Sequence, residues 1–172
     1  MFFYQYVASI KEPDCEDDVV DNRMFGNIFH KSAQLIYDDI MSHNNGRIEK
    51  ASIQKYLNTK GLLESIVDRA FNEELFKVKN SMRSPYYNGL HLINRKVLIE
   101  YLRQLLHSDQ RTAPFEMLAL EDAVYTQIAF ETEDNNVRKI RIGGIIDRLD
   151  RVTDARTGVS TIRVVDYKTG IQ

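Results

Sequence analysis

The spacing of hydrophobic residues divides the chain into two parts. Up to about residue 112, apolar side chains recur every three or four positions, the spacing of helices that bury one face. Turn-forming residues interrupt this pattern at His43-Asn44-Asn45-Gly46 and at Gly61. We therefore expect helices over about 22–42, 49–58, 62–78 and 92–106.

After Pro114 the texture changes to that of β-strands. Segments rich in β-branched and aromatic residues follow one another, separated by the loop signals Glu133-Asp134-Asn135-Asn136 and Thr153-Asp154-Ala155-Arg156-Thr157-Gly158. We expect an α/β fold of α+β character in a single domain, residues 1–172. A helical N-terminal layer, about 1–112, packs on a small central antiparallel or mixed sheet, about 113–172.

Composition fits one ordinary hydrophobic core, with 43% hydrophobic and 28% charged residues. No apolar run approaches the roughly 18 residues that a membrane span needs, and no secretory leader is recognisable, so we expect a cytoplasmic protein without membrane partners. The lone Cys15 can form neither an intramolecular disulfide nor, alone, a metal site. Neither a phosphate-binding glycine loop nor a serine-hydrolase elbow occurs.

Charge is unevenly distributed along the chain. The net charge of −2 gives no general attraction to nucleic acid, but positive residues outnumber acids between Val137 and Lys168. Arg148, Arg151 and Arg163 are candidates for contacts with phosphates. The alternative is that these arginines form the solvated faces of strands.

The acids and the lysine of the last strands form the candidate chemistry. Side chains alternate along a strand, so Asp166 and Lys168 share one side. If the six-residue loop Asp154 to Val159 joins antiparallel strands, Asp147 lies opposite Asp166. Two such carboxylates repel one another, and a Mg²⁺ ion with open coordination positions removes the conflict. The alternative is a buried salt bridge between Lys168 and one aspartate.

Two segments resemble a known family. Gly143-Gly144-Ile145-Ile146-Asp147-Arg148-Leu149-Asp150-Arg151 and Arg163-Val164-Val165-Asp166-Tyr167-Lys168-Thr169-Gly170 resemble the core of the PD-(D/E)XK nuclease superfamily, in its RecB and AddB types. The resemblance implies a restriction-endonuclease-like core. It also implies that Asp147, Asp166 and the main-chain carbonyl of Tyr167 bind Mg²⁺, which Mn²⁺ can replace, and that Lys168 serves hydrolysis.

The same resemblance extends to earlier parts of the chain. Gly26-Asn27-Ile28-Phe29-His30 matches a Gly-x-x-x-His pattern that would make His30 a metal ligand, and Gly26 indicates close approach of backbone or ligand. For His30 alone, a hydrogen-bonded packing role is the alternative. Glu121 is the expected further acid, with Glu116 in reserve. The aromatic start Phe2-Phe3-Tyr4-Gln5-Tyr6-Val7 also resembles the family.

Two features depart from the family pattern. A helix with a Gln-x-x-x-Tyr pattern commonly follows the D-x-K strand, whereas this sequence stops four residues after Lys168. Together with an opening that resembles the end of a helix, this suggests a fragment of a longer protein whose activity is in doubt. Some relatives hold an iron–sulfur cluster through several cysteines, and Cys15 alone predicts none here.

We therefore expect a Mg²⁺-dependent DNA exonuclease of a recombination and repair system, with DNA as substrate and a helicase domain or subunit as partner. The first alternative is a catalytically silent DNA-binding or scaffolding domain. A second reads Asp166-Tyr167-Lys168-Thr169-Gly170 as an aspartyl-phosphate site of the P-type ATPase kind, but Tyr167 displaces the lysine from the required position.

Overall fold

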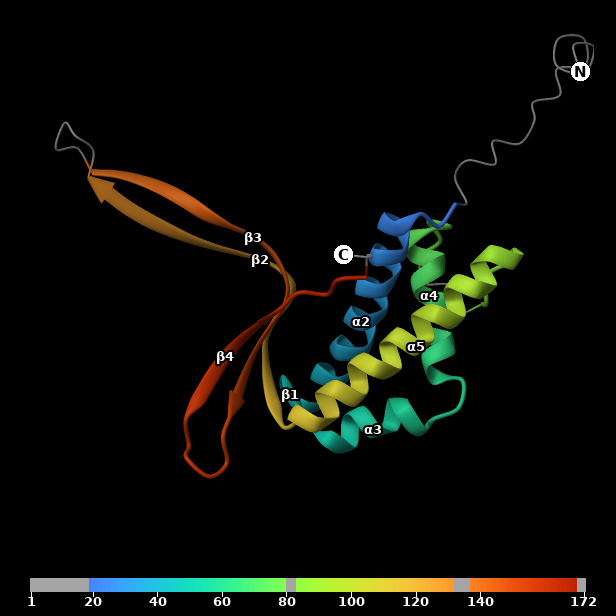
Figure 1. Ribbon diagram of the computed structural model, residues 1–172, viewed down its shortest axis with the longest axis horizontal. Helices are drawn as coiled ribbons and strands as arrows, with labels where there is room; N and C mark the ends of the chain where they lie inside the picture. Colours follow the sequence, from blue (N-terminus) through green and yellow to red (C-terminus); the bar gives the residue numbers. More distant parts are fainter. Residues whose placement is uncertain (1–18, 80–82, 132–136, 170–172) are drawn as a thin grey trace, which may run out of the picture.

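A computed structural model describes residues 19–79, 83–131 and 137–169, and these form a helical part joined to an extended sheet (Figure 1). The helices are α2 (Asn22–Asn44), α3 (Lys50–Asn58), α4 (Leu62–Glu74) and α5 (Gly89–Thr112). Each lies close to the range that the hydrophobic spacing predicted. Cys15, Gly170, the aromatic segment at 2–7 and the loop at 133–136 lie outside the described residues.

Local capping fixes the ends of the two long helices. The Asp21 side chain accepts a hydrogen bond of 2.6 Å from the backbone N–H of Met24 at the start of α2. Asn45 ends that helix in the left-handed conformation, and Asn88 and His91 cap the start of α5 reciprocally. None of the helices within the described ranges is both long and apolar enough to cross a membrane.

Within the described residues the sheet has four antiparallel strands in the order β1-β2-β3-β4. They are β1 (Arg47–Ile48), β2 (Phe115–Glu131), β3 (Val137–Thr153) and β4 (Ser160–Val165). The short β1 was not expected from the sequence; it pairs with the start of β2. The mixed α/β class and the restriction-endonuclease-like arrangement are confirmed.

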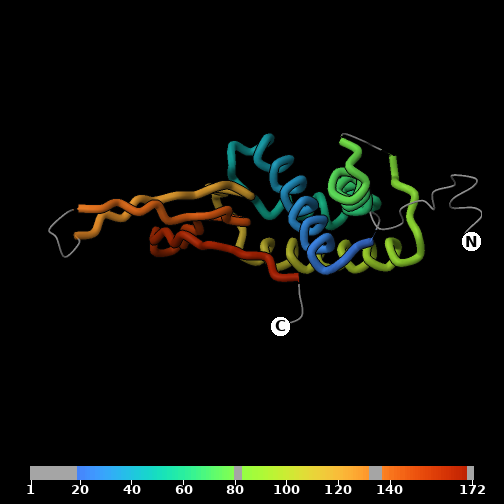
Figure 2. The backbone as a smooth tube through the Cα atoms, turned by 90° about the horizontal axis from the view of Figure 1, so that it is seen from above, coloured from blue at the N-terminus to red at the C-terminus, as the bar shows by residue number. Residues whose placement is uncertain are grey.

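The core lies between the helices and the inner end of the sheet. Helices α2, α4 and α5 supply most of its apolar side chains, and Phe115 and Met117 bring the start of β2 into it. The outer parts of β2 and β3, residues 122–131 and 137–145, are exposed throughout and extend away from the helices (Figure 2). We call these residues the outer hairpin.

A charged network is buried where the helices meet the sheet. Both terminal nitrogens of Arg148 donate to the Asp109 carboxylate of α5, at 2.6 and 2.8 Å, and Arg148 Nε donates to Asp150 at 2.9 Å. The Tyr37 hydroxyl of α2 donates to Asp109 as well. Arg163 donates to both carboxylate oxygens of Asp150, at 2.7 and 2.8 Å. This network ties α2 and α5 to the strands that carry the candidate site.

Candidate metal centre

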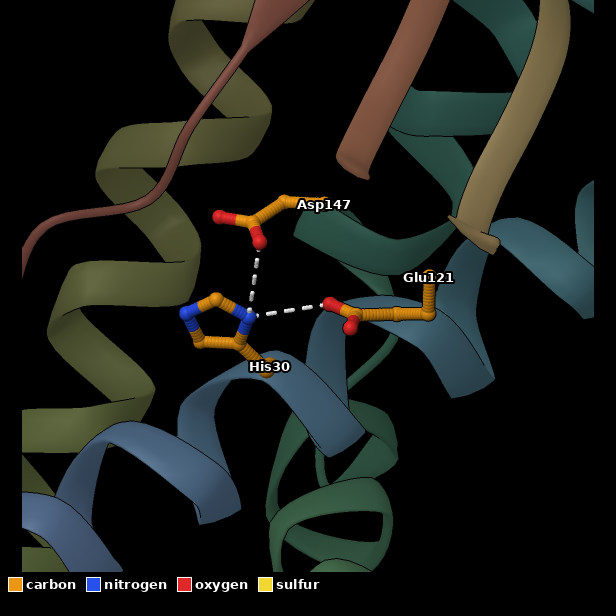
Figure 3. Close-up of side chains that lie close together, drawn as sticks. All are labelled: His30, Glu121 and Asp147. Carbon is orange, nitrogen blue, oxygen red and sulfur yellow. Dashed lines mark hydrogen bonds and ion pairs between the residues drawn. The ribbon is translucent and has the colours of Figure 1, made fainter. Parts of the chain in front are cut away.

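Three side chains from three elements converge at the inner end of the outer hairpin. His30 comes from α2, Glu121 from β2 and Asp147 from β3, and their ligand atoms all lie within 4.8 Å of one another. His30 Nδ1 is 2.9 Å from Glu121 Oε1 and 3.6 Å from Asp147 Oδ1. Figure 3 shows the imidazole turned toward both carboxylates. His30 and two of the three acids of the predicted site, Glu121 and Asp147, are thus neighbours in space.

Strand register explains why the two acids meet. Leu120 pairs with Arg148 and Asp122 with Ile146, which places Glu121 directly opposite Asp147. Glu121 adopts a φ of 48°, in the left-handed region that non-glycine residues rarely occupy. Such a conformation costs on the order of 1–3 kcal/mol and persists only where the surrounding structure holds it, typically at functional sites.

The main chain of Tyr167 organises this cluster from the opposite side. Its N–H donates to Asp147 Oδ2 at 2.7 Å, and its carbonyl oxygen lies 3.3 Å from His30 Nε2. When Nε2 donates to this carbonyl, Nδ1 presents a lone pair to two carboxylate oxygens. A cation between the three atoms removes that repulsion, and an imidazole that donates its other N–H to a carbonyl is the usual arrangement of a metal-binding histidine.

The donor set therefore fits a divalent cation. Two carboxylate oxygens and one imidazole nitrogen leave coordination positions for water and for phosphate oxygens, as Mg²⁺ or Mn²⁺ requires. The sequence suggested the Tyr167 carbonyl as a further ligand. Here that carbonyl faces Nε2, the nitrogen turned away from the carboxylates, and its role as a ligand stays a prediction.

Asp166 and Lys168 follow directly after β4 and pair with each other. The Lys168 Nζ is 2.7 Å from Asp166 Oδ2, and the two side chains are 69% and 56% exposed. The Lys168 ammonium lowers the pKa of Asp166, and Asp166 in turn raises the pKa of Lys168. Because both side chains are exposed, this is not the buried salt bridge considered from the sequence. An exposed ion pair contributes little to stability.

The predicted register of these strands is confirmed as far as β4 extends. Thr153 pairs with Ser160 and Arg148 with Val165, across the loop of residues 154–159. Extended by one pair beyond the end of β4, the same register would set Asp147 opposite Asp166.

Gly26 and His30 share one face of α2, as their spacing predicted. A Cβ atom on Gly26 would lie 3.3 Å from Thr169 Oγ1. The group that approaches Gly26 closely is therefore the side chain of Thr169, the residue after Lys168. A side chain at position 26 would press on the segment that supplies Tyr167 to the centre.

The expectation that Arg148 lies on a DNA-facing surface is wrong. The Arg148 side chain is 1% exposed and enclosed by Asp109, Asp150 and Tyr37. Arg163 is partly buried against Asp150, and the more exposed Arg151 pairs with Glu116 at 2.9 Å. Glu116, the second candidate for the further acid, therefore pairs with Arg151, whereas Glu121 contacts His30.

Sequence reasoning missed the partners of Arg148. Asp109 follows Leu102 and Leu106 on the buried face of α5, where a charged side chain is unusual. That misplaced acid was the available signal, since a buried carboxylate needs a cation close by. Tyr37 gave no comparable signal because a tyrosine on an apolar stripe is an ordinary core residue.

The fold is thus a small α/β domain in which His30, Glu121 and Asp147 meet where β2 and β3 leave the core. The family model of the PD-(D/E)XK nuclease superfamily matches residues 1–172. The chain belongs to this superfamily. No curated protein and no solved structure matches it.

Proposed function

We propose that this chain hydrolyses DNA phosphodiester bonds with a divalent cation, Mg²⁺ or Mn²⁺, held by His30, Glu121 and Asp147, with Asp166 as a further ligand. The observation that carries the proposal is the convergence of His30 Nδ1 on two carboxylates while Nε2 faces the Tyr167 carbonyl. The nuclease superfamily supplies the reaction class.

The bound cation would polarise a phosphoryl oxygen and lower the pKa of the attacking water. Lys168, exposed beside Asp166, is placed to stabilise negative charge that develops on the phosphate. Asp166 holds the ammonium in position through their 2.7 Å ion pair. The Tyr167 N–H orients Asp147 by its hydrogen bond.

Phosphate contacts beyond the centre are proposed for Arg151 and, more weakly, for Arg163. Arg151 is the more exposed, and its partner Glu116 is exposed as well, so a phosphate competes with a solvated pair. Arg163 shares Asp150 with the buried Arg148. Replacing Arg151 should weaken DNA binding more than replacing Arg163.

The motif resemblance extends the proposal to biological role. The segments at 143–151 and 163–170 resemble RecB-type and AddB-type nucleases, which supports exonuclease activity in DNA repair and recombination with a helicase partner.

The first test is calorimetric titration of Mn²⁺ into the wild-type chain and into Asp147→Asn. We expect binding near one equivalent by the wild type and a loss of affinity of more than about tenfold in the variant. Asp122→Asn is the matched control, because this neighbouring acid on β2 is exposed and outside the cluster. A folded wild type that binds no Mn²⁺ would favour the scaffold alternative.

Cleavage then separates binding from chemistry. Lys168→Ala should abolish cleavage of DNA and leave Mn²⁺ affinity nearly unchanged. His30→Ala should weaken Mn²⁺ affinity more than it lowers the melting temperature. Unchanged cleavage by Lys168→Ala would remove this lysine from the mechanism, and equal melting losses with and without Mn²⁺ would make His30 a packing residue.

A further inference from the structure

A separate cavity of about 420 Å³ adjoins Asp166 and Lys168. Tyr101, Gln104 and Leu105 line it from α5, and Asp166, Tyr167 and Lys168 line it from the chain after β4. That chain runs back toward the helices in Figure 2. His30 and Glu121 border a different cavity. The proposed metal centre accounts for Asp166 and Lys168 but gives no role to the residues of α5.

Tyr101 offers an aromatic surface in this cavity. Its ring meets those of Phe25 and Phe29 nearly at right angles, at 84° and 82°, with centroids 6.0 and 6.4 Å apart. These perpendicular contacts hold the ring in place, and Tyr101 remains 39% exposed. Phe29 in turn packs edge-on against Tyr167. An exposed ring with fixed neighbours is a stacking surface that loses little entropy when a flat ligand binds.

The other lining groups suit a flat ligand with polar edges. Gln104 lies one turn after Tyr101 on the same face of α5 and is exposed, so its amide offers both donors and an acceptor. Leu105 adds an apolar contact, and Lys168 supplies a positive charge at the edge nearest Asp166. Aromatic, amide and cationic groups together match a nucleotide, with its base, base edges and phosphate.

We propose that this cavity receives one unpaired base of a single DNA strand, stacked on Tyr101, from a nucleotide next to the phosphate that Lys168 contacts. This inference rests on the proposed nuclease function and adds strand preference to it. In a duplex the faces of each base are covered by its neighbours, so a paired base must first be unstacked at a cost of a few kcal/mol. The chain therefore prefers single-stranded DNA or a frayed end.

The test is a thermodynamic cycle between the ring and the base. Binding of the full chain to fluorescein-labelled oligothymidine is measured by fluorescence anisotropy with Ca²⁺. The measurement is repeated with a series of oligonucleotides, each of which carries a single abasic nucleotide at a different position near the cleaved bond. At one position the wild type should lose about tenfold in affinity, in line with the energy of base–aromatic stacking. Tyr101→Ala should lose about tenfold on the intact strand and nothing further on the abasic one.

Two further variants check the chemistry of the contact. Tyr101→Phe keeps the ring and should bind oligothymidine as the wild type does. Tyr86→Ala is the matched control, since Tyr86 is 95% exposed and lies outside the cavity. If Tyr101→Ala fails to fold, the abasic series on the wild type and Gln104→Ala, expected to weaken binding severalfold, decide the matter.

The outcomes separate this inference from the proposed function. The base site is overturned if the abasic nucleotide lowers the affinity of Tyr101→Ala as much as that of the wild type, or if duplex and single strand bind equally well. This holds even if Mn²⁺ binding and cleavage are intact. Failure of the wild type to bind Mn²⁺ overturns the metal centre, while a base effect that depends on Tyr101 still supports the cavity. A folded chain that binds no oligonucleotide overturns both the base site and the proposed cleavage of DNA.

Discussion

At their inner ends β2 and β3 are fixed in the helical core, whereas in the outer hairpin the same two strands are exposed on both faces (Figure 1). Backbone pairing continues through both regions from Glu116–Arg151 to Glu131–Val137. Among the described residues, however, packing against the hydrophobic core is confined to the inner region. Glu121 and Asp147 lie at the transition, partly buried, where the core can fix their geometry while water and substrate still have access.

The largest expected effect on stability comes from comparing two arginines of β3, one in each region. Arg148→Ala leaves Asp109 buried without its cation and should lower the free energy of unfolding by about 3–5 kcal/mol. Arg141→Ala, in the outer hairpin, removes an exposed side chain that stacks on Tyr125 and should cost about 1 kcal/mol or less. Urea denaturation measures both. Similar losses would contradict the division into an anchored and an exposed region.

A second comparison uses adjacent glycines of the outer hairpin. A Cβ on Gly143 would lie 2.1 Å from the Val124 carbonyl oxygen, whereas a Cβ on Gly144 meets no atom of the described residues within 4 Å. Gly143→Ala should therefore disrupt pairing locally, at a cost of about 1–3 kcal/mol. Hydrogen exchange of the outer-hairpin amides should speed up in Gly143→Ala and stay nearly unchanged in Gly144→Ala. Faster exchange in the core helices would show that the two regions are coupled.

The smallest effect concerns acid stability of the helical part. Burial raises the pKa of Asp68, but hydrogen bonds from Arg95, Tyr87 and Ser84 outweigh it and hold the pKa below its usual range. The stabilisation is present above the unfolded pKa, about 3.9, and is lost as the pH falls through the lower folded value. The stability difference between wild type and Asp68→Asn should therefore shrink below about pH 4, as followed by melting temperature. A difference that does not change with pH would exclude this ionisation as its source.

Periodicity was sufficient to place the helices. The six-residue loop at 154–159 is symmetric, so the register of β3 with β4, from Thr153–Ser160 to Arg148–Val165, could be predicted from sequence alone. Burial of Arg148 could not be predicted, because alternation along β3 assigns a face without showing what covers it. Its partner Asp109 lies 39 residues earlier. The cavity at Tyr101 was missed for the same reason, since it depends on how α5 packs beside the chain after β4.

Asp147 occupies the central strand of the site, with Glu121 opposite on one side and the Asp166 position on the other. This arrangement limits how the sequence can change in length during evolution. Extra residues in the loop at 154–159 leave both facing pairs intact. One residue inserted within β3 between Asp147 and Thr153 would shift its pairing and turn its side chains to opposite faces. Length variation among descendants of this chain should therefore accumulate in its hairpin loops.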